Sequence, residues 1–360
     1  MLESQSLADL KLIKKRSVTG IVAVTSRNFL LQIVAVIANF LFGIFLTPSE
    51  YGIFFGGSAV VEFFIIFSDV GLAAALIQKP GSLTDEDLTT TFTVQQILVN
   101  IIVVIALIFS RPIALFYNLS PAGLWLFRAL AISLTLASLK TIPAIKLERH
   151  LQFSKLIIPE ILENTVFYSV AVMLAWKGFG VTSFTWAVLF RGLVGLVAMY
   201  LLSPFKPGLS LSQSTIKKLL SFGLPFQANT IIAFIKDKLL IAYLFKVLSP
   251  SQVGFIGWAQ KWSNYPLQLV MGPVNKVTFP AYSRIQLQTD TLKKAIDTTI
   301  FFIGVLVFPM VIGLVAIFPA FIRLFPWYSQ WQPALFSLTL FAIAALWASI
   351  STTITNVLSA

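Results

Sequence analysis

The chain carries one short sequence pattern twice. The pattern reads LTPSEYG at residues 46–52 and LSPSQVG at residues 248–254, so Pro48 and Pro250 set an offset of 202 residues. Each copy lies in a short gap between two long apolar stretches, so the repeated unit is an ordered set of membrane-spanning segments. We therefore predict an all-α fold, a polytopic transmembrane helix bundle with two pseudo-symmetric six-helix lobes.

The composition requires a lipid environment. Of the 360 residues, 57% are hydrophobic and 11% are charged, and the mean hydropathy is +0.88. The formal charge of +12 comes mainly from short gaps between apolar stretches, so membrane topology explains it and nucleic acid is not predicted as a partner. With no cysteine and one histidine, His150 in a polar loop, the chain predicts no metal centre and no cofactor.

Stretches of about 17 to 25 apolar residues mark the membrane spans. The first apolar run is too long for a signal peptide, and it follows a short amphipathic segment, residues 1–17. The ten predicted spans are Val18–Leu46, Ile53–Leu76, Thr89–Phe109, Gly123–Ile142, Ile157–Trp176, Val181–Leu202, Leu219–Val247, Gly254–Val274, Ala295–Phe318 and Ala334–Val357.

Lysine and arginine counts orient the bundle, because basic residues in short loops stay on the cytoplasmic side. With the N-terminus inside, the inner segments hold sixteen of these residues and the outer gaps hold three, Arg111, Lys177 and Arg323. We therefore predict a multi-pass protein of the bacterial cell membrane with a cytoplasmic N-terminus.

The repeat also divides the chain. Span one corresponds to span seven, so the first lobe has six spans over residues 18–205, and the second lobe begins at residue 206. Only four spans of the second lobe, 206–360, fit into the sequence. We therefore expect an open reading frame that continues past Ala360, and a natural ten-span protein is the alternative.

Several motifs in a consistent order resemble one family of membrane proteins. They are LTP…YG at 46–52, SDVGLAAALIQ at 68–78, LSFGLP at 220–225 and GP…FPAYSR at 272–284. From about Ser17 onward the chain resembles the Wzx-like polysaccharide flippases, and most closely the colanic-acid and teichuronic-acid exporter branch. These flippases belong to the multidrug/oligosaccharidyl-lipid/polysaccharide exporter superfamily.

The resemblance implies a transporter and not an enzyme. The implied substrate is an undecaprenyl-diphosphate-linked oligosaccharide, moved from the inner to the outer leaflet by alternating access for surface polysaccharide biosynthesis. The implied partners are this lipid-linked substrate, the membrane lipids, a polysaccharide polymerase and other export machinery. A charged diphosphate cannot cross hydrocarbon unaided, so a carrier needs a polar, cationic cavity at mid-depth.

Charged residues inside the spans are the candidates for that cavity, since each costs roughly 2.5–3.5 kcal/mol at the centre of a span. The basic ones are Arg27, Arg128, Arg191, Lys236, Lys238 and Lys261, and the acidic ones are Glu62, Asp69, Glu160, Glu163 and Asp237. Six basic and five acidic residues give the interior of the spans only a weak net positive charge. The position of each residue on its helix must therefore decide which of them line the cavity.

Helical spacing and the repeat narrow the set. Asn229 and Lys236 share a face of span seven, and Asn229 takes the repeat position of Arg27. Span eight carries a polar stripe whose Asn264 takes the repeat position of Glu62. We therefore predict substrate binding by Arg27, Lys236, Lys261 and Arg191, a polar lining of Asn28, Gln32, Asn229, Asn264 and Gln268, and ion coupling through Glu62 and Asp69.

Other roles compete with several of these predictions. Arg191 has as its alternative an ion pair with Glu160 or Glu163 that only holds the first lobe together, and Glu62 and Asp69 have a polar structural role as theirs. Whether the coupling ion is a proton or sodium is open.

Two clusters outside the predicted cavity also have an expected role. Residues 85–87 form an acidic cluster that we expect to be solvated and to cap the third span. The aromatic group Trp327, Tyr328 and Trp331 in an outer gap predicts a membrane-interface position.

Two other functional classes remain as alternatives. A multidrug exporter of the same superfamily would share the architecture but would prefer organic cations, which the basic residues disfavour. A membrane polysaccharide polymerase or glycosyltransferase would need a large outer loop or a soluble catalytic segment, and the longest outer gap has roughly fifteen residues.

Overall fold

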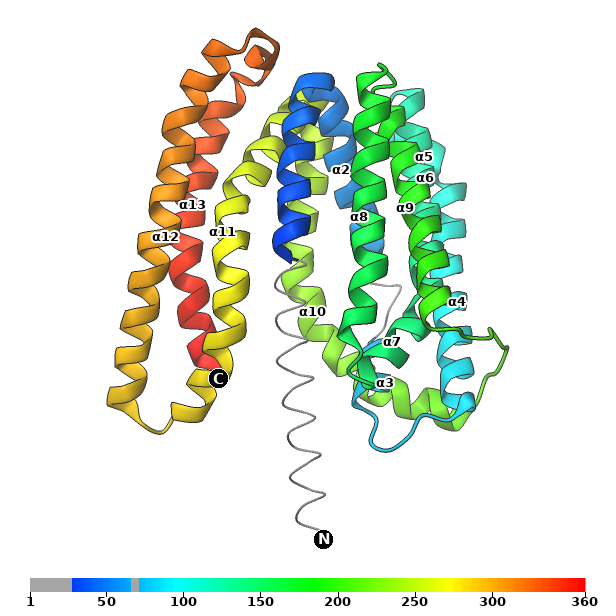
Figure 1. The fold of residues 1–360 in the computed structure, drawn as a ribbon. Helices are drawn as coiled ribbons and strands as arrows, with labels where there is room; N and C mark the ends of the chain where they lie inside the picture. Colours follow the sequence, from blue (N-terminus) through cyan, green and yellow to red (C-terminus); the bar gives the residue numbers. More distant parts are fainter. Residues whose placement is uncertain (1–27, 66–70, 360) are drawn as a thin grey trace. The chain divides into compact units, whose positions relative to one another are not determined.

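The computed structural model describes residues 28–65 and 71–359, without the side chains of a few residues in α2, α11 and α13 and of most residues between 222 and 238 in α10. All secondary structure in this part of the chain is helical (Figure 1). The helices are Asn28–Phe45, α2 (Pro48–Ile65), α3 (Leu72–Gln78), α4 (Asp85–Ile108), α5 (Ser110–Phe116), α6 (Pro121–Leu139), α7 (Thr141–Arg149), α8 (Phe153–Trp176), α9 (Val181–Leu202), α10 (Gln213–Val247), α11 (Pro250–Ile285), α12 (Thr289–Leu324), the 3-10 turn η1 (Pro326–Trp331) and α13 (Ala334–Ser359).

The prediction of an all-α membrane bundle is confirmed. Seven of the described helices are long and apolar enough to cross a membrane. The other three predicted spans are also helical: α2 with α3, α10 and α11. The chain is therefore a multi-pass membrane protein.

The helices are longer than the apolar spans within them. The predicted span Ala295–Phe318 lies inside α12, whose 36 residues extend about 54 Å at the usual rise of an α-helix. The hydrocarbon core is only about 30 Å thick. Hydropathy identifies only the part of a helix that lies in lipid. Backbone hydrogen bonds also stabilise the helix beyond this part, where it extends into water.

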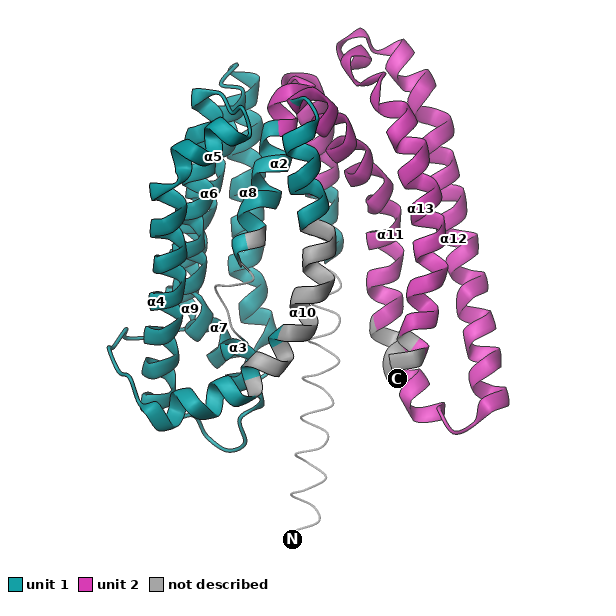
Figure 2. Cartoon of the chain, turned by 180° about the vertical axis from the view of Figure 1, so that it is seen from behind, with its two compact units in different colours: residues 1–34, 53–249 teal, residues 35–52, 250–360 magenta. Residues whose placement is uncertain are grey.

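The chain folds into two compact units, shown in different colours in Figure 2. Unit 1 comprises residues 1–34 and 53–249, and unit 2 comprises residues 35–52 and 250–360. The outer half of the first helix therefore packs with the second repeat, and α10, the first helix of the second repeat, packs with the first. The lobe boundary near residue 205 stays a prediction about the repeat, and the compact units do not follow it.

Unit 1 is built around the antiparallel pair α8 and α9, with α6 packed against α9 and α4 against α6. A tight turn joins α8 to α9, and both of its glycines, Gly178 and Gly180, have positive φ angles of 81° and 53°. Glycine adopts this conformation without the steric cost that a side chain would add. A second core joins α3, α4, α7 and the start of α10 through buried residues such as Leu76, Ile142 and Leu219.

Unit 2 consists of α11, α12 and α13 packed against one another, together with residues 35–52. Val270, Ile303, Val307 and Ala342 form its apolar core between these three helices. The short turn η1 connects α12 to α13 at the end that the predicted topology places outside, which we call the outer end.

Candidate functional site

A polar stripe runs along one face of α11. Lys261, Asn264 and Asn275 are half-buried and Gln268 is exposed. Their spacing of three, seven and fourteen residues from Lys261 keeps all four within one narrow arc of the helix. The predicted common face of Lys261, Asn264 and Gln268 is therefore present in the structure.

The opposite face of α11 packs into the core of unit 2. Ala259, Ser263 and Val270 lie about half a turn away from Lys261 and are buried. The Ser263 hydroxyl donates a hydrogen bond to the Leu338 carbonyl of α13 over 3.4 Å, and Val270 packs against α12 and α13. Packing therefore fixes the rotation of α11, and the polar stripe follows from it.

The first helix carries the two lining residues predicted at its start. Asn28 is exposed and Gln32 is half-buried. The side-chain nitrogen Nε2 of Gln32 is buried with no hydrogen-bond partner in the structure. An amide donor that is buried without a partner costs free energy, so this nitrogen is available to a ligand or a water molecule.

Several predicted site residues lie outside what the structure describes. Arg27 and Asp69 belong to the residues without a described position, and the side chains of Asn229 and Lys236 are likewise not described. Glu62 of α2 is half-buried and has an interaction partner. The roles of these residues stay predictions.

Arg191 belongs to an ion-pair cluster inside unit 1. Its Nε atom lies 3.8 Å from Oε2 of Glu163 in α8, and the ammonium group of Lys140, at the end of α6, pairs with the other oxygen of the same carboxylate. The Arg191 guanidinium also lies over the Phe167 ring, 5.8 Å from its centroid. These contacts favour the structural alternative for Arg191, since the half-buried carboxylate of Glu163 joins α6, α8 and α9.

A cavity of about 330 Å³ opens beside this cluster. Three carboxylate residues, Glu148, Glu160 and Glu163, line it together with apolar side chains such as Ile157 and Met199. Within the described residues, no three histidine or carboxylate side chains lie close enough to hold a metal ion.

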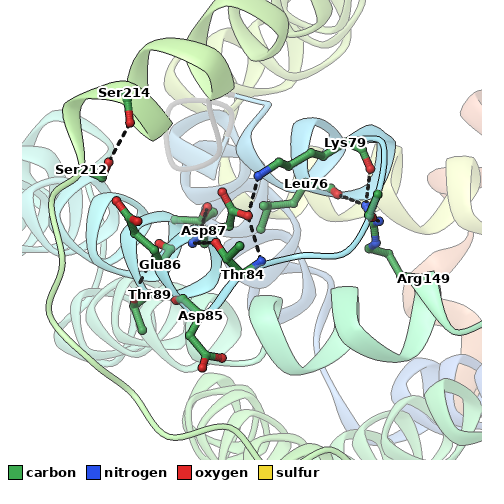
Figure 3. A network of polar contacts seen from close by, with 12 residues as sticks. Leu76, Lys79, Thr84, Asp85, Glu86, Asp87, Thr89, Arg149, Ser212 and Ser214 are labelled. Carbon is green, nitrogen blue, oxygen red and sulfur yellow. Dashed lines mark hydrogen bonds and ion pairs between the residues drawn. The ribbon is translucent and has the colours of Figure 1, made fainter.

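Arg149 organises the loop after α3 (Figure 3). Its Nη1 donates to the carbonyl oxygens of Leu76, Ile77 and Lys79 at 2.7, 3.2 and 2.8 Å, and Nη2 donates to the carbonyl of Gly81. These carbonyls end α3 or follow it and have no partner within the helix. One guanidinium from α7 therefore terminates α3, a role that no sequence pattern indicated.

The expected acidic cap of the third span is present, but one of its members is buried. Thr84 and Asp87 form a reciprocal capping box at the start of α4, as Figure 3 shows. Asp87 is 4% exposed and pairs with the Lys79 ammonium at 2.5 Å. The expectation of a fully solvated cluster was therefore wrong for Asp87, because Lys79 folds back over the helix N-terminus and neutralises the carboxylate.

The aromatic residues of the outer loop do not form an interface belt. Tyr328 and Trp331 are fully buried, and only Trp327 is exposed. The Trp331 indole N–H donates to the Gly43 carbonyl at 2.8 Å, and its ring stacks on Trp258 with centroids 5.4 Å apart. The membrane-interface expectation was wrong for Tyr328 and Trp331, because the end of the first helix packs over them.

The helical bundle and its apolar spans define a polytopic α-helical membrane fold, and comparisons with known proteins agree. The structure superposes on the lipid II flippase MurJ in an inward closed conformation with a TM-score of 0.73, covering 93% of this chain and 76% of MurJ at 16% identity. An inward-facing multidrug resistance MATE family transporter of the MOP superfamily gives a TM-score of 0.55 over 91% of this chain and 78% of the other, at 17% identity. At sequence identities of 16% and 17%, the structural similarity shows that the fold is shared.

The sequence pattern of the family described as polysaccharide biosynthesis protein matches residues 44–335. The chain belongs to this family, which confirms the resemblance inferred from the motifs. It is 26% identical to the succinoglycan biosynthesis transport protein ExoT of Rhizobium meliloti over 80% of this chain and 58% of ExoT. It is 21% identical to the teichuronic acid biosynthesis protein TuaB of Bacillus subtilis over 86% of this chain and 64% of TuaB. The chain thus spans about three fifths of the length of these two relatives.

Proposed function

We propose that the protein flips an undecaprenyl-diphosphate-linked oligosaccharide from the inner to the outer leaflet of the bacterial cell membrane. Family membership, relatives named for succinoglycan transport and teichuronic acid biosynthesis, and a fold shared with a lipid II flippase support this function. The observation that carries it furthest is the polar stripe of α11, which holds a half-buried lysine and two amide side chains on one face of a predicted membrane span.

The stripe suits a diphosphate attached to a sugar. A lysine inside a span costs roughly 2.5–3.5 kcal/mol at the centre of the membrane, so it is retained where it meets a polar cavity or a partner. An ammonium group makes charge-assisted hydrogen bonds to phosphate oxygens, and the amides of Asn264 and Gln268 both donate to and accept from sugar hydroxyls. Lys261 therefore binds the diphosphate, and the amides along the same face bind the sugars.

The proposed mechanism also includes the orientation of the protein in the membrane and the coupling of transport to an ion gradient. The N-terminus is cytoplasmic, because the basic residues concentrate in the inner loops. Arg27 and Lys236 join Lys261 in neutralising the diphosphate, and Glu62 and Asp69 couple transport to a proton or sodium gradient. A polysaccharide polymerase and other export machinery act on the product at the outer face.

The test is complementation of a flippase-deficient bacterium with the full gene product. Surface polysaccharide and the lipid-linked intermediate in the inner leaflet are measured together. Lys261→Ala should lower export roughly ten- to hundredfold, since a charge-assisted contact contributes about 1.5–3 kcal/mol. Arg27→Ala and Lys236→Ala should have similar effects.

Lys293→Ala is the matched control, because Lys293 is an exposed lysine at the start of α12 and should be dispensable. Membrane levels of each variant are compared by immunoblot. Normal export by a Lys261→Ala protein that reaches the membrane in full would contradict the assignment of the site. A parent protein that cannot restore export with any lipid-linked oligosaccharide would contradict the function itself.

A further inference from the structure

The segment that joins the two repeats, residues 203–212, is fastened to unit 1. The Thr90 hydroxyl of α4 donates to the Ser210 hydroxyl at 3.2 Å. Further along α4, the Thr93 hydroxyl donates to the Gly208 carbonyl at 3.2 Å and accepts a hydrogen bond from the Ser210 backbone N–H at 3.1 Å. The segment therefore has a fixed position on α4, at the end of unit 1 that the predicted topology places inside, which we call the inner end.

α10 begins at the inner end with an amphipathic stretch. Figure 1 shows the start of α10 running across the lower ends of α3 and α4, which it contacts. Leu219 is buried in the core that these helices share. On another side of the helix, the half-buried Ile216 and Leu220 and the exposed Lys217 are among the residues that line a groove of about 470 Å³. The groove thus combines apolar side chains with an ammonium group.

The joining segment also exposes apolar side chains. Leu209 is 92% exposed and Leu211 is 61% exposed, although both lie outside the predicted spans. Exposed leucines next to basic residues are typical of segments that lie in the membrane interface, with apolar groups at the acyl boundary and ammonium groups at the headgroups. The positive-inside pattern explains the basic residues of such a segment, but it does not require the leucines.

The basic side chains of this region are not neutralised by the protein. Lys206, Lys217 and Lys218 are exposed, and within the described residues none of the three forms an ion pair. The sequence has no acidic residue from position 164 to position 236. The exposed carboxylates of Asp85 and Glu86, at the start of α4 (Figure 3), do not pair with these lysines. Three ammonium groups are therefore available to anions.

We propose that this surface, formed by residues 203–221 and called the linker surface, binds anionic phospholipids of the inner leaflet. One lipid phosphate contacts Lys217, and its acyl chain lies in the groove over the two apolar side chains. Lys206 and Lys218 attract further headgroups, and the exposed leucines enter the acyl boundary. The inference goes beyond the proposed transport function and does not depend on it, because lipid contact can be measured without transport.

Two other occupants suit the linker surface less well. A diphosphate carries its charges on adjacent groups and is best held by donors that converge, whereas Lys217 and Lys218 are neighbours on a helix and point about 100° apart. Separate headgroups fit this arrangement. The N-terminal segment, residues 1–17, carries four basic and two acidic residues, so its net charge has the same sign as the linker surface. An anionic lipid is therefore the occupant of complementary charge.

The absence of cysteine from the sequence permits a test with a single fluorescent label. Ser214→Cys, at an exposed position shortly before the two adjacent lysines of α10, carries a bimane group. The labelled full chain is reconstituted into phosphatidylcholine vesicles that contain increasing fractions of phosphatidylglycerol or phosphatidylcholine with a quenching doxyl group near the headgroup. The mole fraction that quenches half of the fluorescence measures how readily each lipid reaches the linker surface.

The chain offers a matched control at the start of α12. The sequence TLKKAI at 291–296 resembles TIKKLL at 215–220, and both lysine pairs are exposed. The α12 pair is flanked by the exposed carboxylates of Asp290 and Asp297, which have no counterpart in the linker surface. A bimane at Thr291→Cys should therefore show a weaker preference for phosphatidylglycerol. Equal preference at both labels would indicate a general attraction to basic loops and would overturn a dedicated site.

Half-quenching at position 214 should need at least about fivefold less doxyl phosphatidylglycerol than doxyl phosphatidylcholine, which is the effect of one lysine near an anionic surface. Lys217→Gln with Lys218→Gln should remove most of this preference, and Lys293→Gln with Lys294→Gln should leave it unchanged. Circular dichroism and the melting temperature check that both double variants fold. High salt should also weaken the preference, since it screens exposed charges.

Equal quenching by the two lipids, or a preference that survives the Lys217 and Lys218 substitutions in a folded protein, would overturn the proposal. So would a label that neither lipid quenches, because protein, such as residues 1–17, would then cover the groove. Displacement of the doxyl phosphatidylglycerol by undecaprenyl diphosphate at a lower mole fraction than unlabelled phosphatidylglycerol requires would assign the surface to the transport substrate instead.

Discussion

A comparison of two glycines in α2 tests the packing of the repeated motif. Both Gly52 and Gly57 are buried, and replacing glycine by alanine within a helix favours folding by about 0.8–1.0 kcal/mol through propensity alone. At Gly57 the added Cβ would lie 3.9 Å from Cδ1 of Leu130, an ordinary van der Waals contact. Gly57→Ala should therefore leave stability unchanged or raise it by up to about 1 kcal/mol.

At Gly52 the added methyl group meets backbone. It would overlap the carbonyl oxygen of Pro250, which cannot move aside as a flexible side chain can. Overpacking of this kind costs typically about 1–3 kcal/mol, so Gly52→Ala should be less stable than Gly57→Ala by at least that amount. In the double variant with Gly254→Ala, the second substitution should cost less than the first, because the backbones have already separated.

The measurement is thermal unfolding of the purified proteins in one detergent, followed by tryptophan fluorescence from the eight tryptophans. Circular dichroism at 222 nm checks that each variant is helical before heating. If Gly52→Ala melts at or above the temperature of Gly57→Ala, the two copies of the motif do not touch as described, and the reasoning from steric overlap fails.

Substitutions at three further contacts test features that only the structure reveals. Arg149→Ala should cost about 1.5–3 kcal/mol and speed hydrogen exchange in residues 71–82, with Arg149→Lys in between, as hydrogen-exchange mass spectrometry can show. Lys140→Met removes one of the two cations paired with the Glu163 carboxylate and should lower the melting temperature, whereas adding Glu163→Gln should recover part of that loss. Trp331→Phe should cost only about 1 kcal/mol, since Gln330 still donates to the same carbonyl, whereas Trp331→Ala should cost about 3–5 kcal/mol in the same melting assay.

The fold class followed directly from hydropathy. An apolar stretch of about twenty residues has few ways to satisfy its backbone in lipid, so it becomes a helix whatever its neighbours are. Within residues 28–65 and 71–359, the structure has a helix in each of the ten predicted spans. Hydropathy did not predict how far they extend into water, because at the ends of α11 and α12 the sequence is polar and still compatible with a helix.

The candidate site was predictable only in part. The polar stripe of α11 follows from helical spacing, and α11 is helical over all four of its residues. Arg191 was ambiguous, because a sequence cannot show whether an arginine faces a cavity or a carboxylate on a neighbouring helix. Arg149 gave no signal, since its partners are backbone carbonyls some seventy residues earlier.

The sequence by itself determined that the chain lies in a lipid bilayer, where its membrane spans are, that it contains a repeat and which family it belongs to. Each of these properties depends on residue order and local composition. Tertiary structure decided which repeat each helix end joins, and it buried the apparent interface aromatics Tyr328 and Trp331 against the end of the first helix. The physical reason is that a tryptophan satisfies its apolar ring and its N–H equally well at a membrane surface or against a helix end. Only the packing of Gly43 over Tyr328 selects between these two environments.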